Sequence, residues 1–141
     1  MGKLIVIHTK DELVAQYQIR KVVFVEEQNV SYEEEFDMRE DEAICFLYRV
    51  DSNNIACARA FVDGDSAQIG RVATLKEFRG LGYGLAMIKG IEEYLIQMKV
   101  TKFVVHAQLQ AVPFYAKAGY KKFGDTFYDA NILHIAMKKE I

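Results

Sequence analysis

The feature that most constrains this 141-residue chain is an apolar strand that runs through a glycine-rich turn into a long helix. The turn reads Arg79-Gly80-Leu81-Gly82-Tyr83-Gly84, and apolar side chains then repeat at helical spacing as far as Met98. Glycines let the backbone bend sharply and approach a ligand closely, while the first amides of a helix have no partner within that helix. We therefore predict a phosphate-binding site where this helix begins.

The spacing of the glycines excludes two common classes of phosphate site. A dinucleotide fingerprint requires a third glycine where this chain has Leu85, and it requires an acidic residue about 20 positions later, which is missing here. A P-loop requires a lysine after its glycines, and neither Gly82 nor Gly84 is followed by one. A turn that only packed the helix on the strand would need one or two glycines, so we favour a ligand site.

Strand and helix patterns alternate along the rest of the chain. Residues 3–8 read as a strand, and a capping box of Thr9 and Glu12 opens a helix that we expect to reach about Phe24. Three apolar runs separated by polar turns predict an antiparallel meander: residues 43–50, 55–62 and 67–75. Residues 101–107 form a further strand, parallel to the last of these because a helix connects the two.

A short helix at residues 112–118 and strands at 120–123 and 132–138 complete the pattern. The expected fold class is mixed α/β, with a mostly antiparallel sheet flanked by helices. The length and a composition of 51% hydrophobic residues are typical of a single globular domain over residues 1–141.

Charge and hydropathy exclude several kinds of partner. Eighteen Lys and Arg against twenty Asp and Glu give a net charge of -2, which leaves no positive excess to hold nucleic acid. No run approaches the roughly 20 apolar residues of a membrane helix, and the first residues lack a signal-peptide pattern. We therefore expect a cytoplasmic protein without a membrane partner. Cys45 and Cys57 suit a reducing compartment as buried thiols.

Several polar residues allow two interpretations. Residues 31–42 carry seven acidic side chains and one basic one, and we expect a loop with a short helix that either attracts a cationic amine or forms a solvated surface, the second being favoured. Arg59 and Arg71 alternate with apolar neighbours and either line a cleft or point outward. His8, His106 and His134 lack the spacing of zinc ligands, so we predict no metal site.

Two motifs in the second half of the chain resemble those of the GNAT (Gcn5-related) N-acetyltransferases. Residues 79–84 are similar to the family's Arg/Gln-x-x-Gly-x-Gly/Ala motif, which holds the pyrophosphate of coenzyme A. Residues 108–120 resemble the family's Asn-x-x-Ala-x-x-Phe-Tyr-x-Lys-x-Gly-Phe signature, with Gln108 in place of the asparagine. Residues 23–28, 34–37 and 134–137 extend the resemblance, over nearly the whole chain, to the small bacterial ElaA- and YjcF-like branch.

The resemblance implies an acetyl-CoA-dependent N-acetyltransferase in which an acceptor amine attacks the thioester directly in a ternary complex. It also implies that the strands matching 67–75 and 101–107 splay apart, so that the pantetheine arm pairs with freed backbone groups. The implied coenzyme A ligands are Val72, Ala73, Thr74, Arg79, Gly80, Leu81, Gly82, Tyr83, Gly84, Leu85 and Gln108. The N–H of Ala73 or Thr74 is then the natural oxyanion donor.

Tyr115 is the catalytic residue that the resemblance implies, because a phenol stays protonated at neutral pH and can donate a proton to the departing thiolate. The general base stays open, since some relatives carry a glutamate on the strand matching residues 68–74 and this chain has none. Glu26, Glu27 and Glu34 are candidates, although acidic loop residues are more often solvated. The acceptor is a small-molecule or peptide amine, and the chain is a monomer or a homodimer. The alternative function is an acyl-CoA sensor without turnover.

Overall fold

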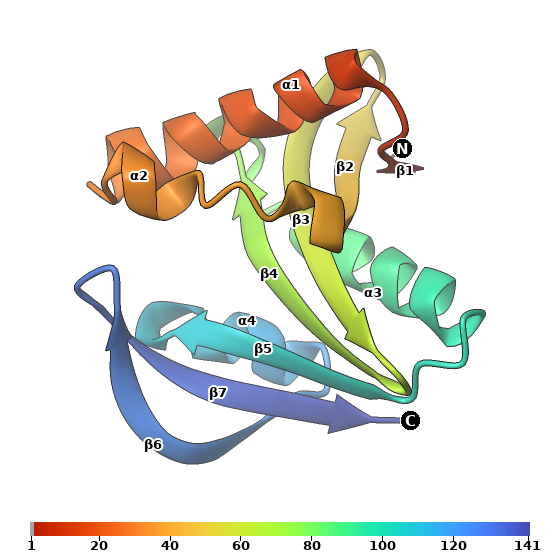
Figure 1. Cartoon of the computed structure of the whole chain (residues 1–141), viewed down its shortest axis with the longest axis vertical. Helices are drawn as coiled ribbons and strands as arrows, with labels where there is room; N and C mark the ends of the chain where they lie inside the picture. Colours follow the sequence, from red (N-terminus) through yellow and green to blue (C-terminus); the bar gives the residue numbers. More distant parts are fainter. Residues whose placement is uncertain (1) are drawn as a thin grey trace.

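A computed structural model describes residues 2–141, in which seven strands form one sheet in the order β1-β2-β3-β4-β5-β7-β6 (Figure 1). The strands are β1 (Gly2–Val6), β2 (Ile44–Val50), β3 (Asn53–Asp63), β4 (Ser66–Thr74), β5 (Lys102–Gln108), β6 (Lys121–Asp129) and β7 (Ile132–Glu140). Neighbouring strands are antiparallel except β4 and β5, which are parallel. The predicted mixed, mostly antiparallel α/β class is confirmed.

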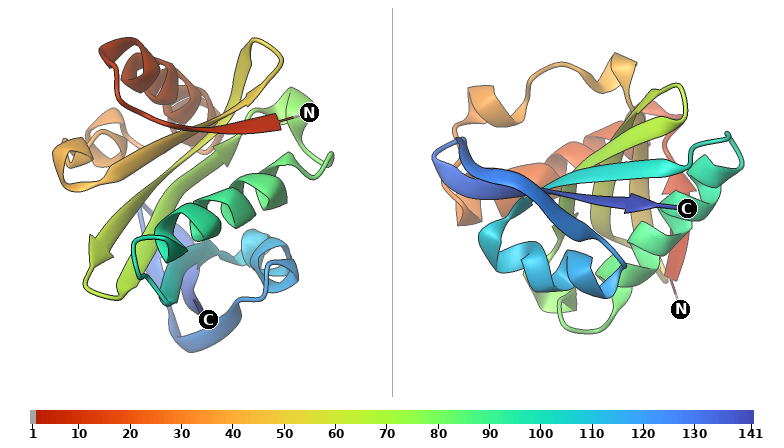
Figure 2. Two further views of the ribbon diagram at one scale, coloured as in Figure 1. Left: turned by 90° about the vertical axis from the view of Figure 1, so that its right-hand side faces the viewer. Right: turned by 90° about the horizontal axis from the view of Figure 1, so that it is seen from below.

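Helices cover both faces of the sheet (Figure 2). They are α1 (Lys10–Arg20), the π-helical η1 (Lys21–Glu27), α2 (Tyr32–Glu35), α3 (Tyr83–Ile96) and α4 (Val112–Lys117), with short 3-10 turns η2 (Glu40–Glu42), η3 (Lys76–Phe78) and η4 (Leu109–Ala111). Alternate residues of β2 serve the two faces, as the period of a strand requires. Phe46 packs in the cluster that contains Ile91 of α3, whereas Leu47 packs with Ile19 of α1. The core is therefore divided by the sheet into two apolar layers.

The boundaries of the first two elements follow from local hydrogen bonds. Glu12 N–H donates to Thr9 Oγ1 at 3.1 Å, and Glu12 Oε1 accepts from Thr9 N–H at 3.0 Å, so the predicted capping box is confirmed. The same carboxylate oxygen accepts from His8 N–H at 2.8 Å, and β1 ends at Val6 instead of His8. Helical structure continues beyond the expected end at Phe24, because α1 is followed directly by a π-helix that ends at Glu27.

The two C-terminal strands are longer than their apolar patterns predict. β6 extends to Asp129 instead of ending at residue 123, and nearly all of it is exposed because it is an edge strand. Its pairing with β7 is irregular between Phe123 and Phe127, where Gly124 has a φ of +75°. An exposed strand has no buried face, so apolar alternation gives no signal of its full length.

The parallel pair separates after four residues. Residues 66–69 of β4 pair with residues 102–105 of β5, and beyond Ile69 the two strands diverge (Figure 1). A β-bulge in β4 accompanies the divergence. Cys57 pairs with Ala73 and Arg59 pairs with Gly70, so one residue of β3 lies opposite two residues of β4. The extra residue places Arg71 in the left-handed region, with a φ of +50°. The bulge bends β4 away from β5 and opens the gap that the resemblance implied.

Candidate active site

A cavity of about 250 Å³ lies in the gap between the diverging ends of β4 and β5. Side chains from both strands, from η1 and α2, from α4 and from the β6–β7 turn line it. Three of the predicted site residues are among them: Val72, Gln108 and Tyr115. The fold thus brings together residues that are more than 40 positions apart in the chain.

The backbone of β4 offers unpaired amides to this gap. Leu75 N–H donates to the carbonyl of Ile55 on β3 at 2.9 Å. Because successive amides of a strand point to opposite edges, Ala73 also faces β3, whereas the amides of Val72 and Thr74 face the gap. Of the two oxyanion donors considered from the sequence, the geometry therefore favours Thr74.

The glycine-rich turn presents open backbone at the start of α3. Gly80 and Gly82 have φ values of +77° and +86°, a conformation that favours glycine, and nothing lies within 4 Å of where their side chains would begin. The first intrahelical bond runs from Ala86 N–H to the Gly82 carbonyl at 3.1 Å, and no side chain caps the helix. The first amides of α3 are therefore available to an anion.

The third glycine serves packing instead. A Cβ on Gly84 would lie 2.9 Å from Cε1 of Phe114, so the first turn of α3 approaches α4 closely enough to exclude any side chain there. Phe114 in turn packs edge-to-face on Tyr115, with ring centroids 5.0 Å apart. Gly84 thereby sets the distance between the glycine-rich turn and the helix that carries Tyr115.

Tyr115 is buried, with 7% of its surface exposed, and its ring also packs on Tyr120 at 5.9 Å. Among residues 2–141 its hydroxyl has no hydrogen-bond partner. The only side-chain nitrogen or oxygen there that is both shielded from solvent and without a hydrogen bond is Nε of Arg71, so the Tyr115 hydroxyl is not shielded. The Tyr115 hydroxyl therefore keeps contact with solvent, through the cavity that it lines. Burial raises its pKa far above the ordinary value of about 10, so the phenol stays protonated and can act as an acid.

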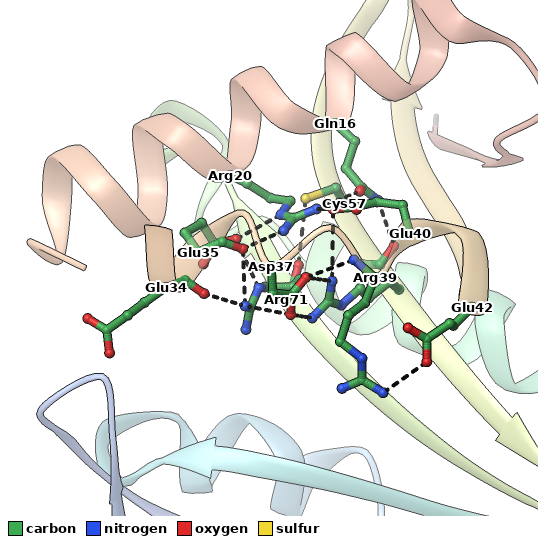
Figure 3. A network of polar contacts seen from close by, with 12 residues as sticks. Gln16, Arg20, Glu34, Glu35, Asp37, Arg39, Glu40, Glu42, Cys57 and Arg71 are labelled. Atoms are coloured by element: carbon green, nitrogen blue, oxygen red, sulfur yellow. Dashed lines mark hydrogen bonds and ion pairs between the residues drawn. The ribbon is translucent and has the colours of Figure 1, made fainter. Parts of the chain in front are cut away.

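Three acidic side chains of the segment 31–42 bind arginines of other elements (Figure 3). Arg20 Nε donates to Glu35 Oε2 at 2.7 Å, and its Nη1 donates to Glu40 Oε1 at 2.9 Å. Arg59 holds Asp37 through two hydrogen bonds of 2.9 Å and 2.6 Å. The expectation of a wholly solvated acidic loop is thus wrong for these carboxylates, and only Glu33, Glu34, Asp41 and Glu42 of this segment's acids are exposed.

Arg71 connects this acidic segment to the bulge of β4. Its Nη2 donates to the carbonyls of Glu34 and Glu35 at 3.2 Å and 3.1 Å. Its Nε lies 3.0 Å from Glu35 Oε2, but the N–H does not point along that line, so this contact is an ion pair without an aligned hydrogen bond. Arg71 lines the cavity, while Arg59 is buried at 4% exposure, so neither points outward as the alternative interpretation had it.

The comparisons with known proteins agree with this geometry. The family model described as an acetyltransferase (GNAT) domain matches residues 8–141. The chain belongs to the GNAT acetyltransferase family. The uncharacterized N-acetyltransferase YjcF of Bacillus subtilis is 32% identical over 139 residues, covering 98% of this chain and 99% of that protein. The resemblance to the YjcF-like branch is therefore confirmed.

Solved structures show the same fold. The crystal structure of Escherichia coli ElaA superposes with a TM-score of 0.83 at 24% identity, covering 99% of both chains. A GNAT acetyltransferase from Elizabethkingia anophelis, crystallised with acetyl-CoA bound, superposes with a TM-score of 0.79 at 14% identity, covering 99% of this chain and 98% of that one. At these identities the likeness concerns the arrangement of the GNAT fold.

Two of the implied coenzyme A ligands already have protein partners in this GNAT domain. Arg79 Nε donates to the Thr74 carbonyl at 2.8 Å, and its Nη2 donates to Glu27 Oε1 at 2.9 Å, which ties the end of β4 to η1. Gln108 Nε2 donates to Gln28 Oε1 at 2.7 Å, and Gln108 Oε1 accepts from Gln110. Leu81 is 63% exposed at the turn.

The candidate bases from the sequence are not equally placed. Glu27 is bound to Arg79, and Glu26 is exposed and does not line the cavity. Glu34 lies at the cavity, but it is exposed and its Oε1 accepts from Ser31 Oγ at 2.9 Å. Within residues 2–141, no three His, Cys, Asp or Glu side chains gather as a metal site would require. The described helices also include none that is long and apolar enough to cross a bilayer.

Proposed function

We propose that this GNAT domain is an acetyl-CoA-dependent N-acetyltransferase that moves an acetyl group to a primary amine by direct attack. The observation that carries the proposal is the separation of β4 and β5. It leaves the amides of Val72 and Thr74 facing the gap between the strands, where Val72 and Tyr115 line the cavity. Membership of the acetyltransferase family supports it.

Acetyl-CoA fits the free backbone at the head of α3. The amides from Gly80 to Leu85 would hold the diphosphate, because several converging N–H groups are needed where the helix dipole alone contributes only about 0.3–1 kcal/mol. The pantetheine arm would pair with Val72 and Thr74 like an added strand, and Gln108 would face it from β5. The acetyl-CoA bound to the Elizabethkingia anophelis protein of the same fold supports this choice of donor.

The chain's own groups meet the demands of acetyl transfer. As the N–C bond forms and the C–S bond breaks, the amide of Thr74 would stabilise the developing oxyanion, and Tyr115 would give its proton to the sulfur. A covalent acyl-cysteine is disfavoured, because Cys57 is wholly buried and burial raises the pKa of its thiol. Transfer in a ternary complex follows.

The acceptor would be a cationic amine of a small molecule or a peptide. Glu34 and Asp129 line the cavity, and neither pairs with a basic side chain among residues 2–141. Arg71 is the one cation of the lining, and Glu35 and Asp37 already neutralise it. The lining therefore carries a negative excess that would attract an ammonium group.

Two measurements on the purified chain test the proposal. Calorimetry with coenzyme A and acetyl-CoA should detect binding, and thiol release from acetyl-CoA should appear with one class of a panel of polyamines, aminoglycosides, amino acids and lysine or N-terminal peptides. Binding without thiol release from any acceptor would favour the sensor function. Absence of coenzyme A binding would overturn the proposal.

A further inference from the structure

The proposed reaction needs a group that removes a proton from the attacking amine, and none of the acidic candidates supplies it. β4 carries no carboxylate between Ser66 and Thr74. Glu27 is held by Arg79, and Glu35 is held by Arg20 and Arg71. The remaining proton acceptors of the cavity lining are the solvent-exposed carboxylates of Glu34 and Asp129 and the imidazoles of His106 and His134.

We propose that His134 is the general base, an inference that rests on the proposed function. Its Nδ1 lies 2.7 Å from the carbonyl oxygen of Ile132. A carbonyl oxygen can only accept, so Nδ1 carries the hydrogen and donates it. This hydrogen bond leaves Nε2 of the neutral imidazole with its lone pair, which is the form that a base requires.

That lone pair is reachable from the cavity. His134 is 8% exposed and lines the cavity together with Tyr115. Its Nε2 has no hydrogen-bond partner among residues 2–141. If Nε2 were also shielded from solvent, it would be a buried nitrogen without a hydrogen bond, and among residues 2–141 the only such side-chain atom is Nε of Arg71. Nε2 of His134 therefore reaches solvent, and the cavity that His134 lines is the space beside it.

The imidazole is held in place by its neighbours. Phe127 of β6 stacks on it with ring centroids 5.8 Å apart and an interplanar angle of 21°, and Gln108 of β5 lies opposite His134 in the β-ladder. Because His134 pairs with Phe127 and Gln108 on both sides of β7, its backbone is fixed by two strands. A base on a strand interior keeps its position better than one on a loop.

The groups around His134 do not replace it as the base. His106 lies on β5, and burial lowers its pKa, so it stays uncharged, but it is more exposed and its Nδ1 lies 3.3 Å from Gln68 Nε2. The other titratable or charged groups facing the same cavity are Glu34, Glu35, Arg71, Tyr115 and Asp129. Of these, Arg71 and Tyr115 offer protons, while the carboxylates are bound to arginine or lie at the exposed side.

The proton balance of the step closes with two groups of this chain. The ammonium group of the acceptor gives one proton to Nε2 of His134, which releases it to solvent. The neutral amine nitrogen then forms a bond to the acetyl carbon and gives a second proton to Nε2. The C–S bond breaks, and the sulfur takes its proton from Tyr115. The imidazolium then releases this proton to solvent and the phenolate recovers one, so the sum is ammonium plus thioester giving amide, thiol and one proton.

Kinetics of His134→Asn test the role. An Asn amide can still donate to the Ile132 carbonyl, but it cannot accept a proton. With the acceptor found in the screen, kcat/KM should fall about 10²-fold or more at neutral pH. The deficit should shrink as the pH approaches about 10, where a lysine-like amine loses its proton unaided. Coenzyme A affinity and the thermal unfolding midpoint should match the wild type, and His8→Asn, outside the cavity, should leave the rate unchanged.

A deficit that is equal at every pH, or a His134→Asn rate within threefold of the wild type, would overturn the proposal. The proposal would also be overturned if the fall in rate at low pH disappeared in His106→Asn and not in His134→Asn. His134→Gln provides a second variant if the asparagine protein does not fold.

The tautomer can be read without any acceptor. Nitrogen NMR of the wild-type imidazoles should show His134 with hydrogen on Nδ1, and hydrogen on Nε2 would overturn the assignment. A wild type that binds no coenzyme A and acetylates nothing would instead remove the proposed function, whichever tautomer the imidazole has.

Discussion

Nε of Arg71 lies 3.0 Å from Oε2 of Glu35, which places a guanidinium of β4 against a buried carboxylate of α2. Arg20 of α1 approaches the same oxygen at 2.7 Å. One carboxylate thus connects the helical layer to the bulge that opens the cavity. Arg20, Arg59 and Arg71 balance Glu35, Asp37 and Glu40 in this network, so no net charge is buried.

Glu35→Gln tests how far this network stabilises the fold. Removing the charge takes away the buried carboxylate that Arg20 and Arg71 share and leaves them Glu40 and Asp37, so we expect the free energy of unfolding to fall by about 3 kcal/mol. The neighbouring Glu34→Gln, exposed to solvent, should change it by less than about 0.5 kcal/mol. Urea unfolding of both variants measures the difference, and equal small effects would show that the network contributes little.

Tyr115→Phe tests the proposed acid. The substitution keeps the packing on Phe114 and Tyr120 and removes only the proton that the sulfur would take. We expect kcat to fall about 10²-fold or more while coenzyme A affinity, measured by calorimetry, stays unchanged. Tyr128→Phe, at a side chain that is 74% exposed, serves as control. Full activity of Tyr115→Phe would rule out the acid role.

Gly84→Ala tests the contact between α3 and α4. The new Cβ would lie 2.9 Å and 3.1 Å from two ring atoms of Phe114, so we expect a loss of about 1–3 kcal/mol of stability. Gly90→Ala lies in the same helix, where the nearest atom is 3.4 Å away, and better helix propensity should leave it neutral or stabilised by up to about 1 kcal/mol. Thermal unfolding of the pair decides, and equal midpoints would contradict the steric argument.

Glu27→Gln tests whether the Arg79 pair competes with phosphate. The pair is partly exposed, with side-chain accessibilities of 42% and 31%, so its rupture is worth only about 0.2–1 kcal/mol. Freeing Arg79 and removing a negative charge should therefore raise coenzyme A affinity by up to about fivefold. Glu26→Gln, next to it and exposed, should leave the affinity unchanged. Weaker binding by Glu27→Gln would mean that the pair supports the site.

Asp37→Asn tests the pH dependence of stability. The hydrogen bond from Arg59, aided by its charge, holds the pKa of Asp37 well below its usual range. A lowered folded-state pKa contributes stability that is complete above the unfolded value of about 4 and is lost as the pH falls toward the folded value. The wild type should therefore lose stability below about pH 4 more steeply than Asp37→Asn. Urea unfolding across that range measures both slopes, and parallel slopes would contradict the assignment.

Several parts of this protein could be predicted from local sequence because the interactions behind them are local. The capping box of Thr9 and Glu12 spans three residues, and the helical repeat before Met98 reflects one buried face. The parallel placement of β5 beside β4 followed from the helix between them. The acetyltransferase resemblance followed from the spacing around Gly82 and Tyr115, and the family comparison confirmed it.

The amino-acid order by itself determined the mixed sheet, the glycine-rich turn and the family, since periodicity, glycine spacing and motif order are all written along the chain. Only the tertiary structure decided that Glu35, Asp37 and Glu40 pair with arginines, because their partners lie on other elements up to 36 positions away. It alone also decided that Nε2 of His134 is free to take a proton, because the tautomer depends on a carbonyl oxygen whose position the fold sets. Contacts between residues far apart in the chain produce no periodic pattern in the sequence. Which charged side chains are exposed to solvent therefore depends on the fold and not on residue type.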